Sequence, residues 1–283
     1  MSTKDFGVIF DDFAADYERT RVPRFRPFVK KLLQLYDTRP GSHVLDAGCG
    51  TGLAGTLVAP RVGHGGQVLG LDASERMLEI ARHKAQGFGF TQCEFVLGDV
   101  TQMDLPDKLF DLVISSFALW GEPHVIFDEF HRVLNSHGVL LLQHWGAEQS
   151  AAAHIFHEAL ERFATAKPHA HLKRVRELLA LDRAQWADMN SPDAFERALV
   201  DAGFARAAGN WFADTVHFAS LDELIEYHSV GARSRLEIAA MDEQTRAEFD
   251  RAIRDALRPL ETPRGIDVEM RAIQVIARKT PTN

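Results

Sequence analysis

The chain of 283 residues is long enough for one large α/β domain with additional elements, or for two small domains. Its formal net charge of −8 argues against a nucleic-acid-binding protein, which needs a clustered basic face. Two isolated cysteines, Cys49 and Cys93, indicate neither a disulfide framework nor a zinc site, so we expect no bound metal.

Nothing in the sequence indicates export or a membrane span. Residues 1–5 lack an apolar signal core. No run reaches the length of about 18 apolar residues that a membrane-spanning helix requires. We therefore expect a cytoplasmic protein without a membrane span and without a nucleic-acid partner.

The first 40 residues predict a helical lid. Apolar and aromatic side chains recur there at helical spacing, namely Phe10, Phe13, Tyr17, Phe25, Phe28, Val29, Leu32, Leu33 and Tyr36. Pro23 and Pro27 favour two helices with a break between them, and Pro40-Gly41 predicts a turn after the second helix.

Strands and helices alternate over residues 41–147, which we expect to form a cofactor-binding core. Short apolar strands are predicted at residues 44–47, 67–71, 93–97, 110–115 and 138–144. Helices are predicted at 53–58, ended by Pro60, after the N-cap residue Ser74, and at 125–134. Apolar strands separated by helices are typical of a parallel sheet covered on both faces, and right-handed crossovers make it doubly wound.

Residues 148–283 predict late strands and a helical cap. The expected helices are 151–166, 171–181, 193–202, 221–228 and 242–257, and the expected strands are 205–219 and 268–277. No convincing linker divides the chain. We therefore expect a single α/β domain over residues 1–283, with a Rossmann-like sheet of seven strands.

The most informative stretch is Val-Leu-Asp-Ala-Gly-Cys-Gly-Thr-Gly at residues 44–52. It predicts a buried strand that ends in a glycine turn and leads into a helix, so a polar ligand can lie against bare backbone. The run ends in G-x-G-x-G. Leu53 stands where the dinucleotide-binding fingerprint has its third glycine, which argues against a nicotinamide-dependent oxidoreductase.

Two carboxylates follow the next two predicted strands. Asp72 closes the strand after the glycine turn, where a doubly wound nucleotide-binding fold accepts hydrogen bonds from ribose hydroxyls. Asp99 follows the third strand, where a carboxylate can accept from the exocyclic amine of adenine or can simply cap a turn. The carboxyl ends of parallel strands meet at one edge, so we expect the turn and both carboxylates to form one site.

These motifs together resemble the class I S-adenosylmethionine-dependent methyltransferases, and within them the small-molecule group of ubiquinone and menaquinone biosynthesis. The resemblance covers residues 8–146. It includes Gly-Leu-Asp-Ala-Ser at 70–74, Gly-Asp-Val at 98–100, Phe-Asp-Leu-Val-Ile-Ser at 110–115 and Phe-His-Arg-Val-Leu-Asn-Ser-His-Gly at 130–138. His137 replaces a glycine usual in the family, at the end of the fifth strand far from the expected cofactor.

The resemblance implies S-adenosyl-L-methionine as cofactor and assigns roles to individual residues. The methionine part would lie against Asp46, Gly48, Cys49, Gly50 and Gly52. Asp72 with Ala73 would hold the ribose, Met77 would pack on the adenine, and Asp99 would bond its amine beside the backbone of Val100. Ser115 would lie near the cofactor amino group.

Two lid residues keep alternative roles. Tyr17 resembles a tyrosine that closes over the cofactor, or it is a core residue under the lid. Arg21 pairs with the cofactor carboxylate, or it faces solvent.

The acceptor side is less specific. His144 is the first candidate for a general base and His124 the second, although methyl transfer needs a base only for acceptors of high pKa. Phe117, Trp120 and Trp145 are candidate substrate-binding residues, and with Phe156 and Trp211 they indicate an apolar or aromatic small-molecule acceptor. His154 and His157 have the spacing of a metal pair, but no cysteine or carboxylate pattern supports a metal.

Two alternative functions and the oligomeric state remain open from the sequence. A methyltransferase-fold protein can bind the cofactor and act as a cyclase or as an interaction module. A nicotinamide-dependent oxidoreductase is a further alternative that Leu53 disfavours. The sequence leaves both a monomer and a homodimer open.

Overall fold

A seven-stranded sheet forms the centre of the protein, in a computed structural model that describes residues 4–146 and 150–279. In sequence order the strands are β1 (His43–Ala47), β2 (Gln67–Asp72), β3 (Cys93–Leu97), β4 (Phe110–Ser116), β5 (Leu134–His144), β6 (Phe204–Phe218) and β7 (Ile266–Lys279). In space the order is β3-β2-β1-β4-β5-β7-β6, with β1 to β5 parallel and β7 antiparallel to both its neighbours. The Rossmann-like α/β arrangement predicted from the sequence is confirmed.

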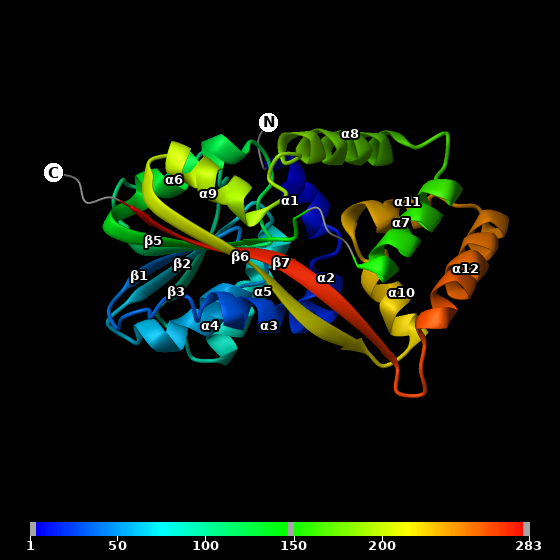
Figure 1. Cartoon of the computed structure of the whole chain (residues 1–283), viewed down its shortest axis with the longest axis horizontal. Helices are drawn as coiled ribbons and strands as arrows, with labels where there is room; N and C mark the ends of the chain where they lie inside the picture. Colours follow the sequence, from blue (N-terminus) through cyan, green and yellow to red (C-terminus); the bar gives the residue numbers. More distant parts are fainter. Residues whose placement is uncertain (1–3, 147–149, 280–283) are drawn as a thin grey trace.

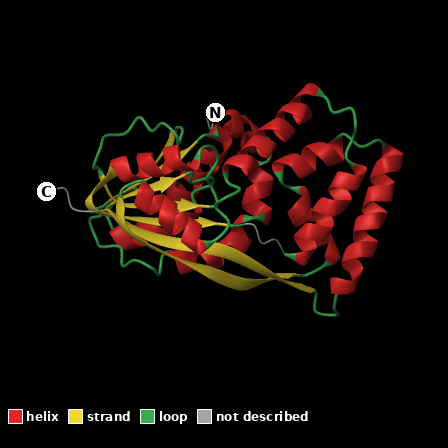
Figure 2. Cartoon of the chain, turned by 45° about the horizontal axis from the view of Figure 1, so that its top comes forward, coloured by secondary structure: helices red, strands yellow, loops and turns green. Residues whose placement is uncertain are grey.

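Helices cover both faces of the sheet and extend beyond one end of it (Figures 1 and 2). One face carries α3 (Val22–Leu32), α4 (Leu53–Val62) and α5 (Glu75–Gly87), and the other carries α6 (Pro123–Val133) and α9 (Pro192–Asp201). The lid adds α1 (Lys4–Asp11) and α2 (Ala14–Thr20). The helices beyond the sheet are α7 (Ala151–Phe163), α8 (Ala170–Gln185), α10 (Leu221–Ser229), α11 (Ala232–Ala239) and α12 (Glu243–Leu257), which a short 3₁₀ turn (Arg258–Leu260) follows.

The central strands are buried on both sides because their side chains alternate between two apolar layers. Leu112 and Ile114 of β4 point into the layer shared with α3 and α4, whereas Val113 between them points into the layer shared with α6 and α9. All three are fully buried. This burial on both faces explains why the parallel strands read as continuous apolar runs rather than alternating ones.

Several predicted boundaries were wrong where proline was taken as a helix breaker. Pro27 lies inside α3 and Pro60 lies inside α4, which ends at Gly63 with a φ of 62°. The lid therefore contains three helices, and the break between the second and third falls at Arg21. The cap contains α11, which the sequence analysis missed. No helix among the described residues is long and apolar enough to cross a membrane.

A buried ion cluster joins three helices of the cap. The Glu237 side chain on α11 is fully buried and accepts two hydrogen bonds from Arg176 of α8, at 2.7 and 2.6 Å. Arg233 donates to the same carboxylate at 3.2 Å and pairs with Glu161 of α7 at 2.5 Å. Burial makes each partner dependent on the other, because an unpaired buried charge is costly.

We expect Glu237→Ala to lower the free energy of unfolding by about 3–5 kcal/mol, the usual effect of removing one partner from a buried ion pair. The measurement is urea unfolding followed by circular dichroism. Glu248→Ala, on the exposed face of α12, is the control and should change the stability by less than about 0.5 kcal/mol. Equal stability of the two variants would show that the cluster contributes little.

Candidate functional site

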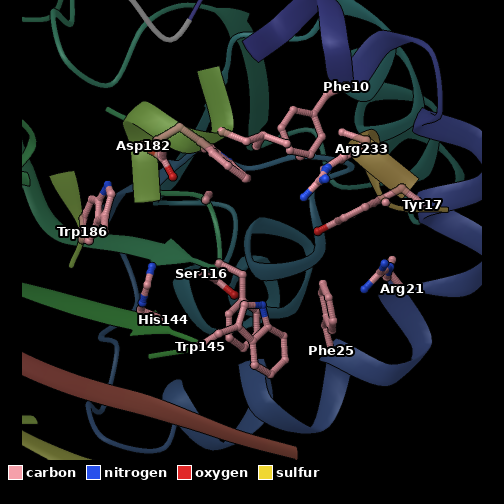
Figure 3. Close-up of a pocket in the computed structure, with 18 of the residues that line it drawn as sticks. Phe10, Tyr17, Arg21, Phe25, Ser116, His144, Trp145, Asp182, Trp186 and Arg233 are labelled. Carbon is pink, nitrogen blue, oxygen red and sulfur yellow. The ribbon is translucent and has the colours of Figure 1, made fainter. Parts of the chain in front are cut away.

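A cavity of about 1170 Å³ opens where the parallel strands end. Its floor consists of residues that follow β1 to β5, and its walls come from the lid and from α7, α8, α10 and α11 (Figure 3). The order of the strands reverses between β1 and β4, which is where open α/β sheets bind their ligands. Single-ligand pockets usually measure about 300–1,000 Å³, so this cavity has room for two molecules side by side.

The glycine turn adopts the backbone conformation that the sequence predicted. Gly48, Gly50 and Gly52 all have positive φ, at 69°, 53° and 78°. Gly48 and Gly50 line the cavity, whereas Gly52 faces Ala81 and Phe95 in the layer beneath it. The turn therefore exposes its peptide groups on one side and closes a core on the other.

Two buried carboxylates hold the turn in place. Asp46 accepts the backbone N–H of Gly55 at 2.6 Å, and its burial raises its pKa to about 7. Asp72 accepts the N–H groups of Gly50 and Ser74 through separate oxygens, at 2.7 and 2.9 Å, and burial raises its pKa as well. Each oxygen of Asp72 keeps a lone pair that can accept a further hydrogen bond at the cavity wall.

The remaining predicted cofactor residues divide into two groups. Cys49, Ala73, Met77 and Val100 line the cavity as expected. Asp99 does not line it: its Oδ1 accepts from the N–H and the hydroxyl of Thr101, and it is 7% exposed. The backbone on either side of Asp99, at Gly98 and Val100, forms that part of the wall.

Ser115 also lies outside the cavity. It is fully buried, and its hydroxyl donates to the Ala47 carbonyl at 3.1 Å. The next residue, Ser116, lines the cavity instead, because adjacent side chains of a strand point to opposite faces. Thr51 supplies another polar group, which the sequence analysis had not singled out: its buried hydroxyl has no hydrogen-bond partner among the described residues.

The lid lies directly on the loop after β2. A Cβ atom at Gly7 would lie 2.0 Å from the Ala73 carbonyl oxygen, so α1 approaches this loop as closely as backbone allows. Asp11 accepts the hydroxyl of Ser74 at 2.5 Å and the N–H of Arg76 at 3.0 Å. These contacts close the cavity over Met77.

Both predicted lid residues face the cavity. Burial raises the pKa of Tyr17 above its usual value, so its hydroxyl stays protonated. The Arg21 guanidinium lies 4.0 Å from the centre of the Tyr227 ring. No carboxylate among the described residues pairs with Arg21, and it is thus available to an anionic group of a ligand.

We expect Gly7→Ala to loosen the lid, since the added methyl group cannot fit against Ala73. Limited proteolysis should then cleave the segment before Pro23 faster than in the unsubstituted protein. Gly87→Ala is the control, because a Cβ there meets nothing within 4 Å and should raise the stability by about 0.5 kcal/mol. Equal protection of the lid in both variants would contradict the close packing of α1.

Aromatic rings form a further wall of the cavity. Phe117, with a φ of 57°, stacks on Trp145 with the ring centres 3.8 Å apart and the planes 6° apart. Phe25 of the lid packs on both rings, and Trp120 lies across the cavity against Phe10. The three predicted substrate-binding residues thus line the same cavity, Phe117 and Trp145 as a stacked pair and Trp120 beside the lid.

Two other aromatic residues that the sequence analysis suggested do not line this cavity. Phe156 is fully buried in the core, and Trp211 lies outside the cavity with 37% of its surface exposed.

The two candidate bases differ in position. His124 is exposed on α6 and does not line the cavity. His144 lines it and stacks on Trp186 with ring centres 5.0 Å apart, and burial lowers its pKa to about 4. Its Nδ1 accepts the N–H of Gly146 at 3.1 Å, so the neutral ring carries its proton on Nε2. His144 therefore offers the cavity a hydrogen-bond donor rather than a base.

We expect the His144 ring to stay neutral down to about pH 5, which nitrogen NMR of the imidazole can measure, with His144→Gln assigning the signal. The unfolded chain binds this proton near pH 6.5, so stability should fall as the pH drops from about 6.5 to about 4. A charged His144 ring at pH 6 would contradict the assigned tautomer.

The cap contributes polar groups that the sequence analysis did not identify. Asp182 and Arg183 of α8 line the cavity together with Trp186, which follows that helix, as do His228 and Arg233 from α10 and α11. No local motif marks these residues, because only the packing of the cap brings them to the strand ends. His154 and His157 line the same wall, but no cluster of three or more metal ligands occurs among the described residues.

Comparison with known proteins identifies the family. A methyltransferase domain model matches residues 38–191, which is more than half of the chain. The chain belongs to this methyltransferase domain family. It is 36% identical to the nocamycin O-methyltransferase of Saccharothrix syringae over 133 residues. The matched residues make up 46% of this chain and 48% of that protein. The chain is 34% identical over 121 residues to a demethylmenaquinone methyltransferase of Bacillus cytotoxicus, covering 42% and 51%.

The chain spans about half the length of these curated relatives. Solved structures resemble this protein in fold over most of its length. The YcgJ protein of Bacillus subtilis matches with a TM-score of 0.57 at 18% identity, covering 90% of this chain and 98% of that one. The cyclase SpnF matches with a TM-score of 0.53 at 19% identity, covering 91% and 82%. At these identities the structures support the fold alone.

Proposed function

We propose that this methyltransferase-family protein transfers a methyl group from S-adenosyl-L-methionine to a small apolar or aromatic molecule. The observation that carries the proposal is the shape of the cavity. One half consists of the glycine turn and Asp72, and the other half is an aromatic chamber at Phe117 and Trp145. A cofactor and an acceptor can therefore lie in contact within one cavity.

The residues of the first half fit the cofactor. The free lone pairs of Asp72 suit the two ribose hydroxyls, and the bare backbone at Gly98 and Val100 suits the flat adenine. The unpartnered Thr51 hydroxyl and the unpaired Arg21 suit the amino and carboxylate groups of the methionine part. The cofactor would supply a methyl group on a positively charged sulfur.

The contribution of the protein is mainly positional. The lid and the cap form walls of the cavity, and the aromatic wall can orient a flat acceptor toward the cofactor half. Holding two reactants in line can lower a barrier by about 7–11 kcal/mol. Tyr17, which burial keeps protonated, can donate a hydrogen bond without changing the charge of the site.

Two alternatives are less well supported. The likeness to SpnF, at 19% identity, concerns the fold alone and gives no argument for cyclisation. An oxidoreductase needs the dinucleotide turn, which Leu53 interrupts, and the family match is to methyltransferases.

Release of S-adenosylhomocysteine with a panel of phenolic and enolic acceptors separates methyl transfer from cofactor binding alone. Binding of NAD(H) in preference to S-adenosylhomocysteine would contradict the proposal.

We expect Asp72→Ala to weaken the binding of S-adenosylhomocysteine by about 3 kcal/mol or more, because each hydrogen bond to the carboxylate contributes about 1.5–3 kcal/mol. Isothermal titration calorimetry measures this loss. Asp201→Ala removes an exposed carboxylate at the end of α9 and should leave the affinity unchanged. Unchanged affinity in Asp72→Ala would exclude the assigned contact with the ribose.

A further inference from the structure

Asp182 is placed to meet an acceptor in the aromatic half of the cavity. Its Oδ1 accepts the backbone N–H of Gly121 at 3.0 Å, which fixes the orientation of the carboxylate. No hydrogen bond from the described residues reaches Oδ2, and the side chain lines the cavity (Figure 3). One oxygen is therefore used to hold the side chain while the other remains an acceptor.

The residue after α8 binds the same glycine. The indole N–H of Trp186 donates to the Gly121 carbonyl at 2.8 Å, so Asp182 of α8 and Trp186 at its C-terminal end bind both backbone polar groups of Gly121. The face of Trp186 stacks on His144, whose Nε2 carries the proton. Asp182 and His144 thus belong to one packed unit, which presents a hydrogen-bond acceptor and a hydrogen-bond donor to the cavity (Figure 3).

The other cavity carboxylates have different surroundings. Asp46 and Asp72 hold the glycine turn, and Glu161 pairs with Arg233. Glu158 lies on the exposed face of α7. Asp182 is thus the partly buried carboxylate of the acceptor half that keeps an oxygen without an ion pair among the described residues.

We propose that Asp182 and His144 together bind a hydroxylated aromatic acceptor, with Asp182 accepting the hydrogen bond of the hydroxyl that becomes methylated. This inference rests on the proposed methyl transfer. The acceptor oxygen forms a bond to the methyl carbon, the carbon–sulfur bond breaks with its electron pair on sulfur, and the hydroxyl proton passes to Asp182 Oδ2. The Nε2–H of His144 binds a second oxygen of the acceptor.

The charge state of Asp182 suits this role. Burial raises its pKa to about 6, opposed by the hydrogen bond from Gly121. Ionisable groups that line the same cavity are His144 of β5, His157 and Glu158 of α7 and the neighbouring Arg183 of α8, and Glu122 immediately precedes α6. The carboxylate is thus mostly ionised at neutral pH, and it is a stronger proton acceptor than an ordinary aspartate.

The test compares two probes of nearly equal shape, 2-naphthol and 2-methoxynaphthalene, which lacks the hydroxyl proton. Calorimetry on the protein without added cofactor measures both dissociation constants. We expect the unsubstituted protein to bind 2-naphthol about ten-fold more tightly at pH 8, the effect of one net hydrogen bond to a charged group. The preference should decline as the pH falls through about 6, where Asp182 takes up its proton.

Asp182→Asn is the decisive variant. Its amide oxygen can still accept the Gly121 N–H, while its NH₂ group replaces the acceptor that faces the cavity. The preference for 2-naphthol should disappear and its pH dependence with it. Asp188→Asn, an exposed aspartate just beyond α8, is the matched control and should keep both.

Three outcomes would overturn the inference: equal binding of the two probes to the unsubstituted protein, a preference that survives in Asp182→Asn, or binding of neither probe at millimolar concentration. A separate titration with S-adenosylhomocysteine distinguishes this failure from failure of the proposed function. Retained binding of that cofactor product would leave methyl transfer in place and exclude only the hydroxylated aromatic acceptor.

Discussion

The contact between Gly48 and Ala118 determines the shape of the site. A Cβ atom at Gly48 would lie 2.4 Å from the Ala118 Cβ, so glycine alone lets the loop after β4 descend onto the turn after β1. The φ of 69° at Gly48 imposes the same requirement. Because Phe117 precedes Ala118, this contact also places the ring that stacks on Trp145. The cofactor half and the acceptor half of the cavity are therefore built on one shared contact.

The other end of this loop is bound by the cap. At Gly121, with a φ of 104°, the N–H binds Asp182 of α8 and the C=O binds Trp186, the residue that caps this helix. The loop that carries Phe117 and Trp120 is thus fixed to the sheet at one end and to α8 at the other. The position of α8 depends in turn on Glu237, which neutralises Arg176 inside the cap. The Arg176–Glu237 ion pair, which lies in the cap, therefore helps to position the loop that carries Phe117 and Trp120.

The sequence predicted the half of the site that local chemistry determines. The glycine turn, Asp72 and Met77 are recognisable because strand, turn and helix follow one another within a few residues. Asp182 and Trp186 were missed, since they lie beyond the predicted helix 171–181 and only tertiary packing brings them to the cavity. The prediction chose Ser115, whereas its neighbour Ser116 lines the cavity. A shift of one residue along a strand moves a side chain to the opposite face.

The carboxylates of the cavity and the buried carboxylate of the cap differ in the groups that bind them. Asp46, Asp72 and Asp182 accept backbone N–H groups, and burial raises the pKa of all three. Backbone donors orient a carboxylate without cancelling its charge, so it still attracts a hydroxyl. Glu237 instead forms ion pairs with the guanidinium groups of Arg176 and Arg233. These pairs neutralise its charge, so Glu237 stabilises the cap. The carboxylates of the cavity are therefore held by neutral backbone dipoles, whereas full ion pairing occurs inside the cap.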